Sequence, residues 1–161
     1  MEEYKVVTRS VEETKALAER LALILEKGDV ISLTGDLGAG KTAFVQGLAE
    51  GLGVERRVTS PTFPIIKEYS GRIPLYHFDV YRLTSPAELV DLGYEEYFYD
   101  DGACVLEWGD RVSELFPPDY LEVLFERAGE DMREIAFIPR GDRWEERMRD
   151  LFGRLRGAIG A

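Results

Sequence analysis

Residue types that build disulfides and zinc sites are scarce in this chain of 161 residues. It has one cysteine, Cys104, and one histidine, His77. A lone cysteine excludes an internal disulfide and a zinc centre built from several cysteines. We expect Cys104 to be a buried strand residue that contributes packing rather than chemistry.

Long apolar runs are missing as well. No stretch approaches the roughly 20 apolar residues of a membrane-spanning helix. The segment Met1–Lys5 has neither the basic nor the apolar region of a secretory signal peptide. We therefore expect a cytoplasmic protein without membrane contact.

Positive charge is in deficit. The chain has 20 lysines and arginines against 31 aspartates and glutamates, a net charge of −11, which disfavours nucleic-acid binding through phosphate neutralisation alone. One segment departs from this balance, because Arg143–Gly157 carries five arginines against three acids. Such a stripe suits an acidic partner or a nucleic acid, but the solvated face of an amphipathic helix is the interpretation we favour.

Length and composition predict one globular domain over residues 1–161. Hydrophobic residues make up 45% and charged residues 32%, as in ordinary soluble domains. Apolar runs alternate with amphipathic stretches, which predicts an α/β fold. Strands are expected at 4–8, 30–34, 65–69, 73–81, 103–106, 121–125 and 135–138. The strands on either side of 70–72 predict an antiparallel hairpin, so the sheet is expected to be mixed, mostly parallel and flanked by helices.

Helix ends are marked by capping residues and glycines. Ser10 with Glu13, and Ser85 with Glu88, have the spacing of capping boxes at helix starts. Gly28 and Gly53 are predicted to end the helices that precede them. Further helices are expected from about Thr42 to Leu52 and from Asp142 onwards.

The segment Gly35–Thr42 is Gly-Asp-Leu-Gly-Ala-Gly-Lys-Thr and fits the P-loop pattern G-x-x-x-x-G-K-[ST]. Its glycines let backbone N–H groups surround a β-phosphate. Lys41 is placed to reach the β- and γ-phosphates and Thr42 to bind Mg²⁺. An apolar strand precedes the loop, and the helix that follows directs its positive N-terminus at the anion. The chain has no asparagine, so the Asn-Lys-x-Asp motif that selects guanine is absent, and we expect ATP.

Two acids are candidates to serve the metal or the attacking water, which a P-loop enzyme needs at a strand end. Glu107 follows the apolar run 103–106 and is favoured. Asp79 follows a second strand, where a plain surface acid and a functional one are equally plausible from the pattern. His77 shares a strand face with Asp79 and is expected to be packed or hydrogen-bonded rather than catalytic. Trp108 is expected either to flank the nucleotide or to lie in the core.

The motifs together resemble a known family. They are Gly35–Thr42, Ser-Pro-Thr-Phe at 60–63, His-Phe-Asp-Val-Tyr-Arg-Leu at 77–83, Leu-Gly-Tyr-Glu-Glu-Tyr-Phe at 92–98 and Leu-Glu-Trp at 106–108. In this order and spacing they are similar to the TsaE (YjeE) family of small bacterial P-loop ATPases. The resemblance runs from about Ser10 to Val123.

The resemblance implies Mg²⁺-dependent ATP hydrolysis in support of threonylcarbamoyladenosine modification of A37 in tRNA. Family members act with the TsaD and TsaB proteins, which transfer the group, and meet tRNA only through that complex. By motif position the resemblance makes Lys41, Asp79 and Glu107 catalytic and makes Thr42 and Glu107 the metal ligands. The implied nucleotide-binding residues are Asp36, Leu37, Gly38, Ala39, Gly40, Lys41, Thr42, Ala43, Thr62 and Trp108. Ala43 stands where the family commonly has a second threonine.

Three alternatives remain open at the level of the sequence. A small-molecule kinase has the same loop but needs a second substrate pocket and a lid. A nucleotide sensor binds ATP or ADP and responds without turnover. Direct nucleic-acid binding as a sole function is disfavoured by the acidic charge.

Overall fold

A seven-stranded sheet forms the centre of the computed structural model, which describes residues 3–35, 40–59 and 66–159, with side chains to 154. The strand order is β1-β7-β6-β2-β5-β4-β3. The strands are β1 Tyr4–Thr8, β2 Val30–Gly35, β3 Ile66–Tyr69, β4 Leu75–Asp79, β5 Ala103–Glu107, β6 Tyr120–Arg127 and β7 Arg133–Arg140. The helices are α1 Val11–Ala22, α2 Lys41–Gly51, α3 Pro86–Asp91, α4 Glu95–Phe98, the 3₁₀ helix η1 Gly109–Leu115 and α5 Asp142–Ile159.

The expected mixed sheet is confirmed. Its four central strands, β6, β2, β5 and β4, are parallel to one another. Antiparallel pairing occurs at both sides, in the predicted β3–β4 hairpin and in the β1, β7 and β6 group. The parallel register aligns Asp79 with Glu107, and Glu107 with Leu33, so the carboxyl ends of three strands meet at one edge.

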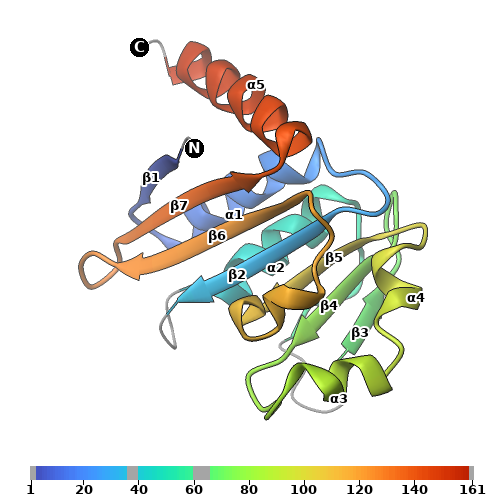
Figure 1. The fold of residues 1–161 in the computed structure, drawn as a ribbon. Helices are drawn as coiled ribbons and strands as arrows, with labels where there is room; N and C mark the ends of the chain where they lie inside the picture. Colours follow the sequence, from blue (N-terminus) through green and yellow to red (C-terminus); the bar gives the residue numbers. More distant parts are fainter. Residues whose placement is uncertain (1–2, 36–39, 60–65, 160–161) are drawn as a thin grey trace.

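Helices cover both faces of the sheet, as Figure 1 shows. Helices α1, α2 and α5 pack on one face over a core that includes Phe44, Leu48, Phe125 and Trp144. The shorter α3, α4 and η1 cover the other face over a second core around Phe78 and Phe98. Because β2, β4 and β5 are buried on both faces over most of their length, they appear in the sequence as mostly apolar runs, whereas β6 alternates between buried and half-buried residues. No helix in the described ranges is both long enough and apolar enough to cross a membrane.

Two glycines place α2 close against α1. A Cβ at Gly47 would come within 2.4 Å of the Lys15 carbonyl oxygen, and one at Gly51 within 2.6 Å of the Ala22 Cβ. The glycines therefore allow the two helix backbones to approach where any side chain would push them apart. This contact fixes α2, whose first residues carry the P-loop lysine and threonine.

Some predicted helix ends are correct and others are wrong. Ser10 accepts a hydrogen bond from Glu13 N at 3.1 Å and begins α1 as expected. Gly53, with φ of 80°, follows the end of α2 as expected. Gly28 does not end α1, which stops at Ala22 because turn hydrogen bonds take over from there. Ser85 precedes α3 but its side chain makes no capping hydrogen bond, because Glu88 instead accepts from the backbone and hydroxyl of Thr84.

Candidate active site

Lys41 lies at the carboxyl edge of the sheet, where β2 ends and α2 begins. Its side chain is 5% exposed, its Nζ donates to the Gly35 carbonyl oxygen at 2.6 Å, and it lies 4.0 Å from the centre of the Trp108 ring. Gly35 packs so tightly on β6 that a Cβ there would come within 2.5 Å of the Phe125 carbonyl oxygen. The ammonium group is thus held beside the two ends of the P-loop. The predicted residues Asp36, Leu37, Gly38 and Ala39 lie outside the described residues.

Gly40 supplies the turn into α2. Its φ of 101° is left-handed, a conformation that glycine adopts at little cost. The backbone thereby reverses into the helix just before Lys41 and Thr42. Ala43, the next predicted contact, occupies the first turn of α2 and is half-buried.

Glu107 is the acid nearest the P-loop helix. It ends β5, the strand next to β2, and is 4% exposed. Its Oε1 accepts a hydrogen bond from the Thr42 hydroxyl at 3.4 Å, and its Oε2 is 2.7 Å from Nε2 of His77. The structure therefore brings together Thr42 and Glu107, the two predicted metal ligands. A buried carboxylate is costly unless hydrogen bonds satisfy it, and these two contacts do so.

Asp79 lies beside Glu107 at the end of β4. The two residues are cross-strand partners in a parallel pair, so their side chains leave the sheet on the same face. Asp79 is half-buried and its Oδ1 accepts from the backbone N–H of Tyr81 at 3.0 Å. The second acid predicted from the sequence is therefore positioned next to the first.

Trp108 follows Glu107 in a left-handed backbone conformation, with φ of 65° and ψ of 32°. This conformation is rare for a bulky residue and is typical of functional sites and sharp turns. The backbone N–H of Trp108 donates to the Leu33 carbonyl oxygen at 2.7 Å. Its ring packs on Tyr81 at 4.9 Å between centroids and faces the Lys41 ammonium. Of its two predicted environments, the structure places the ring beside the P-loop lysine, at the border of the second core.

The sequence missed some side chains of this site. His77 was expected to be buried or hydrogen-bonded, which is correct, but its partner Glu107 is 30 residues away and no local pattern indicates it. Arg111 lies 5.0 Å from the centre of the Tyr81 ring and had no signal in the sequence. Thr62, which the resemblance implies is a nucleotide-binding residue, lies outside the described residues.

The oxygen donors fit a magnesium ion. Mg²⁺ prefers hydroxyl, carboxylate and phosphate oxygens, and it usually takes only one or two protein ligands. Thr42 and Glu107 supply one oxygen of each protein type. Within the described ranges no group of three or more histidines, cysteines and acids forms a metal site. In nucleotide-binding sites Mg²⁺ commonly completes its shell with phosphate oxygens and water.

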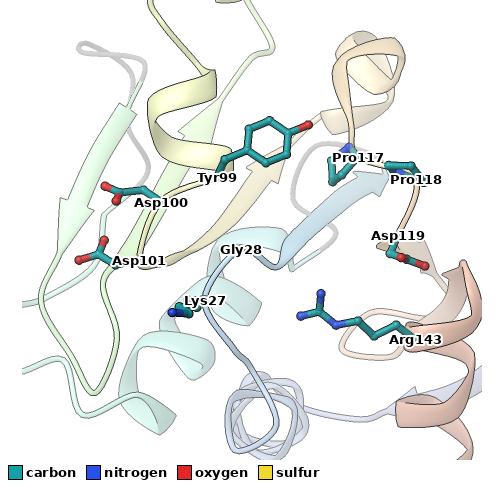
Figure 2. Close-up of a pocket in the computed structure, with 9 residues that line it drawn as sticks. All are labelled: Lys27, Gly28, Tyr99, Asp100, Asp101, Pro117, Pro118, Asp119 and Arg143. Atoms are coloured by element: carbon teal, nitrogen blue, oxygen red, sulfur yellow. The ribbon is translucent and has the colours of Figure 1, made fainter.

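A pocket of about 530 Å³ lies at the opposite edge of the sheet (Figure 2). Its residues come from the segments before β2, β5 and β6 and from the start of α5. Tyr99 and Pro117 lie on one side of the space, and Lys27 and Arg143 on the other. None of the predicted site residues lines it, and in parallel sheets ligands bind at the carboxyl ends of strands.

The arginine-rich segment is partly occupied by internal ion pairs. Arg143 and Arg147 contact the Asp29 carboxylate at 2.9 Å and 2.8 Å, and Arg154 pairs with Asp150 at 3.1 Å. Asp29 is 2% exposed. Burial raises the pKa of Asp29. The hydrogen bond from the backbone N–H of Glu26 and the two arginines lower this pKa, but burial is the larger effect. The favoured interpretation of a solvated helix face therefore fits Arg154, which is 69% exposed, but not Arg147, which is 13% exposed and with Arg143 fastens α5 to the segment before β2.

A P-loop that joins the central strand to a helix, with an acid at the end of the neighbouring strand, defines an α/β protein of the P-loop class. A family model for threonylcarbamoyl adenosine biosynthesis protein TsaE matches residues 8–135. The chain therefore belongs to the TsaE family.

Individual relatives agree with this assignment. A Bacillus subtilis protein named tRNA threonylcarbamoyladenosine biosynthesis protein TsaE is 51% identical over 146 residues, covering 90% of this chain and 91% of its own. A protein of the same name from Treponema pallidum is 43% identical, covering 82% and 98%. The crystal structure of YdiB from Bacillus subtilis matches with a TM-score of 0.84 and 45% identity, covering 95% of this chain and 96% of its own.

Proposed function

We propose that this protein hydrolyses Mg²⁺-bound ATP in support of threonylcarbamoyladenosine formation in tRNA. The observation that carries the proposal is the grouping of Lys41, Thr42, Glu107 and Asp79 at one edge of the sheet. The named role of the TsaE relatives supplies the pathway.

Hydrolysis begins with in-line attack of water on the γ-phosphate. The backbone N–H groups of the P-loop and the Lys41 ammonium stabilise the charge that builds on the phosphoryl oxygens. For this, Lys41 leaves the Gly35 carbonyl oxygen and turns to the phosphates. Asp79, beside Glu107, orients the attacking water or a water of the metal shell.

Thr42 Oγ1 and Glu107 hold the metal in this proposal. Bound Mg²⁺ would neutralise charge on the β- and γ-phosphate oxygens. The side chains of Thr42 and Glu107 already point at each other, so a small separation of the two oxygens would admit an ion between them.

The reaction partners are TsaD and TsaB, and tRNA is met through their complex. The chain carries a net charge of −11, and two arginines of its most basic segment are paired with Asp29. Both features disfavour direct binding to tRNA as the main interaction. ATP hydrolysis by this protein therefore serves the transferring complex rather than the transfer itself.

The test is phosphate release from Mg·ATP by the purified protein, with and without TsaD and TsaB. Wild type, E107A and the control E146A, which changes an exposed acid on α5, are run side by side. We expect release that rises with the partner pair, that is lost in E107A and that is unchanged in E146A.

Other outcomes would contradict the proposal in distinguishable ways. Tight ADP binding without any phosphate release in any mixture would indicate a nucleotide sensor. Loss of ATP with phosphate appearing on a second small molecule would indicate a kinase. Phosphate release unaffected by E107A would remove Glu107 from the mechanism.

A further inference from the structure

His77 is the one histidine of the chain, and it is buried beside the candidate metal ligand. Its side chain is 0% exposed, and its Nε2 is 2.7 Å from Oε2 of Glu107, whose side chain is 5% exposed. The histidine comes from β4 and the glutamate from β5. Both side chains leave the sheet on the face that α2 covers, since the intervening Val105 lies in the core beneath that helix.

The hydrogen bond has a defined direction. An ionised carboxylate only accepts hydrogen bonds, so Nε2–H of His77 is the donor. The other ring nitrogen, Nδ1, is buried and has no hydrogen-bond partner among the described residues. The neutral tautomer with the proton on Nε2 avoids leaving a second buried N–H donor unsatisfied. The polar contact of this ring is therefore directed at Glu107.

Holding one carboxylate oxygen determines where the other one points. With Oε2 bound to His77, Oε1 faces the Thr42 hydroxyl at 3.4 Å. A hydrogen bond to one oxygen restricts rotation of the carboxylate, which would otherwise present either oxygen in several orientations. The hydrogen bonds thus connect His77 to Glu107 and Glu107 to Thr42, which lies in the first turn of α2.

We propose that His77 is a positioning residue that orients the Glu107 carboxylate toward the metal ion of bound Mg·ATP. The inference rests on the proposed function and adds to it a residue that touches neither nucleotide nor metal. Partners of this kind, which hold a metal ligand from behind, change metal affinity or activity by about 10- to 100-fold when they are removed.

Two substitutions separate the hydrogen bond from the polarity of the side chain. H77Q places an amide N–H₂ near the position of Nε2 and can still donate to Glu107. H77N places its amide near the position of Nδ1 and falls short of Glu107. Both variants keep an uncharged polar side chain at the same buried position, so they form a matched pair.

The experiment measures binding rather than turnover. The affinity for AMP-PNP, an ATP analogue with a non-hydrolysable β–γ bridge, is determined by isothermal titration calorimetry in EDTA and at a series of Mg²⁺ concentrations. We expect H77N to raise the Mg²⁺ concentration for the half-maximal gain in affinity about 10- to 100-fold, and H77Q to stay much closer to wild type. Affinity in EDTA should be the same in all three proteins.

The double variant H77N/E107Q tests whether His77 acts through Glu107. We expect H77N to cause no further shift in Mg²⁺ dependence when Glu107 is already replaced, because coupled residues are not additive. Melting temperatures are recorded for every variant. If H77N does not fold, H77M replaces it, since Met fills the site without a donor and carries the same expectation.

The outcomes separate this inference from the proposed function. A wild type whose AMP-PNP affinity gains nothing from Mg²⁺ overturns the proposed function and this inference together. A normal gain in wild type with equal behaviour of H77Q and H77N overturns the positioning role alone. A weakening of the same size in EDTA, or an added shift in the double variant, overturns it as well.

Discussion

Two buried carboxylates, Asp29 and Glu107, lie at opposite edges of the parallel strands and have opposite kinds of partner. Asp29 precedes β2 and contacts two guanidinium groups, those of Arg143 and Arg147, as well as the Glu26 N–H at 2.7 Å. Glu107 ends β5 and contacts a histidine and a hydroxyl. The negative charge of Asp29 is balanced by two arginines. The contacts of Glu107 with His77 and Thr42 include no arginine or lysine, so its charge is available to a metal ion. The partners, rather than burial, therefore distinguish Asp29 from the candidate metal ligand Glu107.

The largest expected effect is on activity, from the substitution E107Q. Gln keeps the shape of the side chain but removes the charge that we propose holds the metal, so we expect phosphate release from Mg·ATP to fall by at least about 100-fold. The unfolding free energy changes by less than about 1 kcal/mol, because a buried charge is removed without leaving a cavity. Phosphate release and urea denaturation measure the two quantities.

The same measurements on D29N provide the control. Asp29 is about as buried as Glu107 but lies at the other edge of the sheet, so D29N should lower stability and leave phosphate release intact. A loss of activity in D29N equal to that in E107Q, at a temperature where both are folded, would remove the distinction between the two carboxylates.

The second prediction concerns stability and the arginine pair. R147M keeps an apolar side chain but removes the guanidinium, which contacts Asp29 and whose Cζ lies 4.6 Å from the centre of the Trp144 ring. We expect a loss of about 2–4 kcal/mol in unfolding free energy, since a buried carboxylate loses one of its two cations. Urea denaturation measures the loss, and phosphate release should not change.

The pH dependence of stability gives a smaller effect at Asp29. Burial raises its pKa in the folded protein, so the folded state binds this proton more tightly than the unfolded state, where the pKa is about 3.9. The contribution of Asp29 is fully present below the unfolded pKa and is lost as pH rises through the folded pKa. We therefore expect the unfolding free energy of wild type minus that of D29N to decrease from about pH 4 upward. A difference that increases with pH over this range would contradict the assigned direction.

The sequence predicted the grouping of residues at the candidate site better than the ion pairs at the opposite edge of the sheet. The P-loop, Glu107 and Asp79 have local signals, namely a glycine pattern and acids that follow apolar strands. Acids that follow parallel strands lie at the same edge of the sheet. The α/β fold class, once predicted, therefore also predicted that Asp79 and Glu107 lie close together. The positions of β2, β4 and β5 were also right, because strands that are buried on both faces leave apolar runs.

The contacts that the sequence could not predict join distant segments. Asp29 pairs with Arg147, 118 residues further on, and His77 pairs with Glu107, 30 residues away. Such pairs depend on how α5 and β4 pack against their neighbours, and no period or motif records that. The early end of α1 was missed for a related reason: Leu25 is buried in the core and so continues the apolar pattern beyond the helix itself.

The smallest effect is expected for an exposed ion pair on the same helix as the Asp29 contacts. Arg154 and Asp150 are 3.1 Å apart, but their side chains are 69% and 60% exposed. Water screens such a pair, so R154A should change the unfolding free energy by less than about 0.5 kcal/mol. Urea denaturation of R154A beside R147M makes the comparison within α5 itself. If the two variants lost the same stability, burial of Asp29 would have no special role and the last turns of α5 would contribute as much as its contact with the sheet.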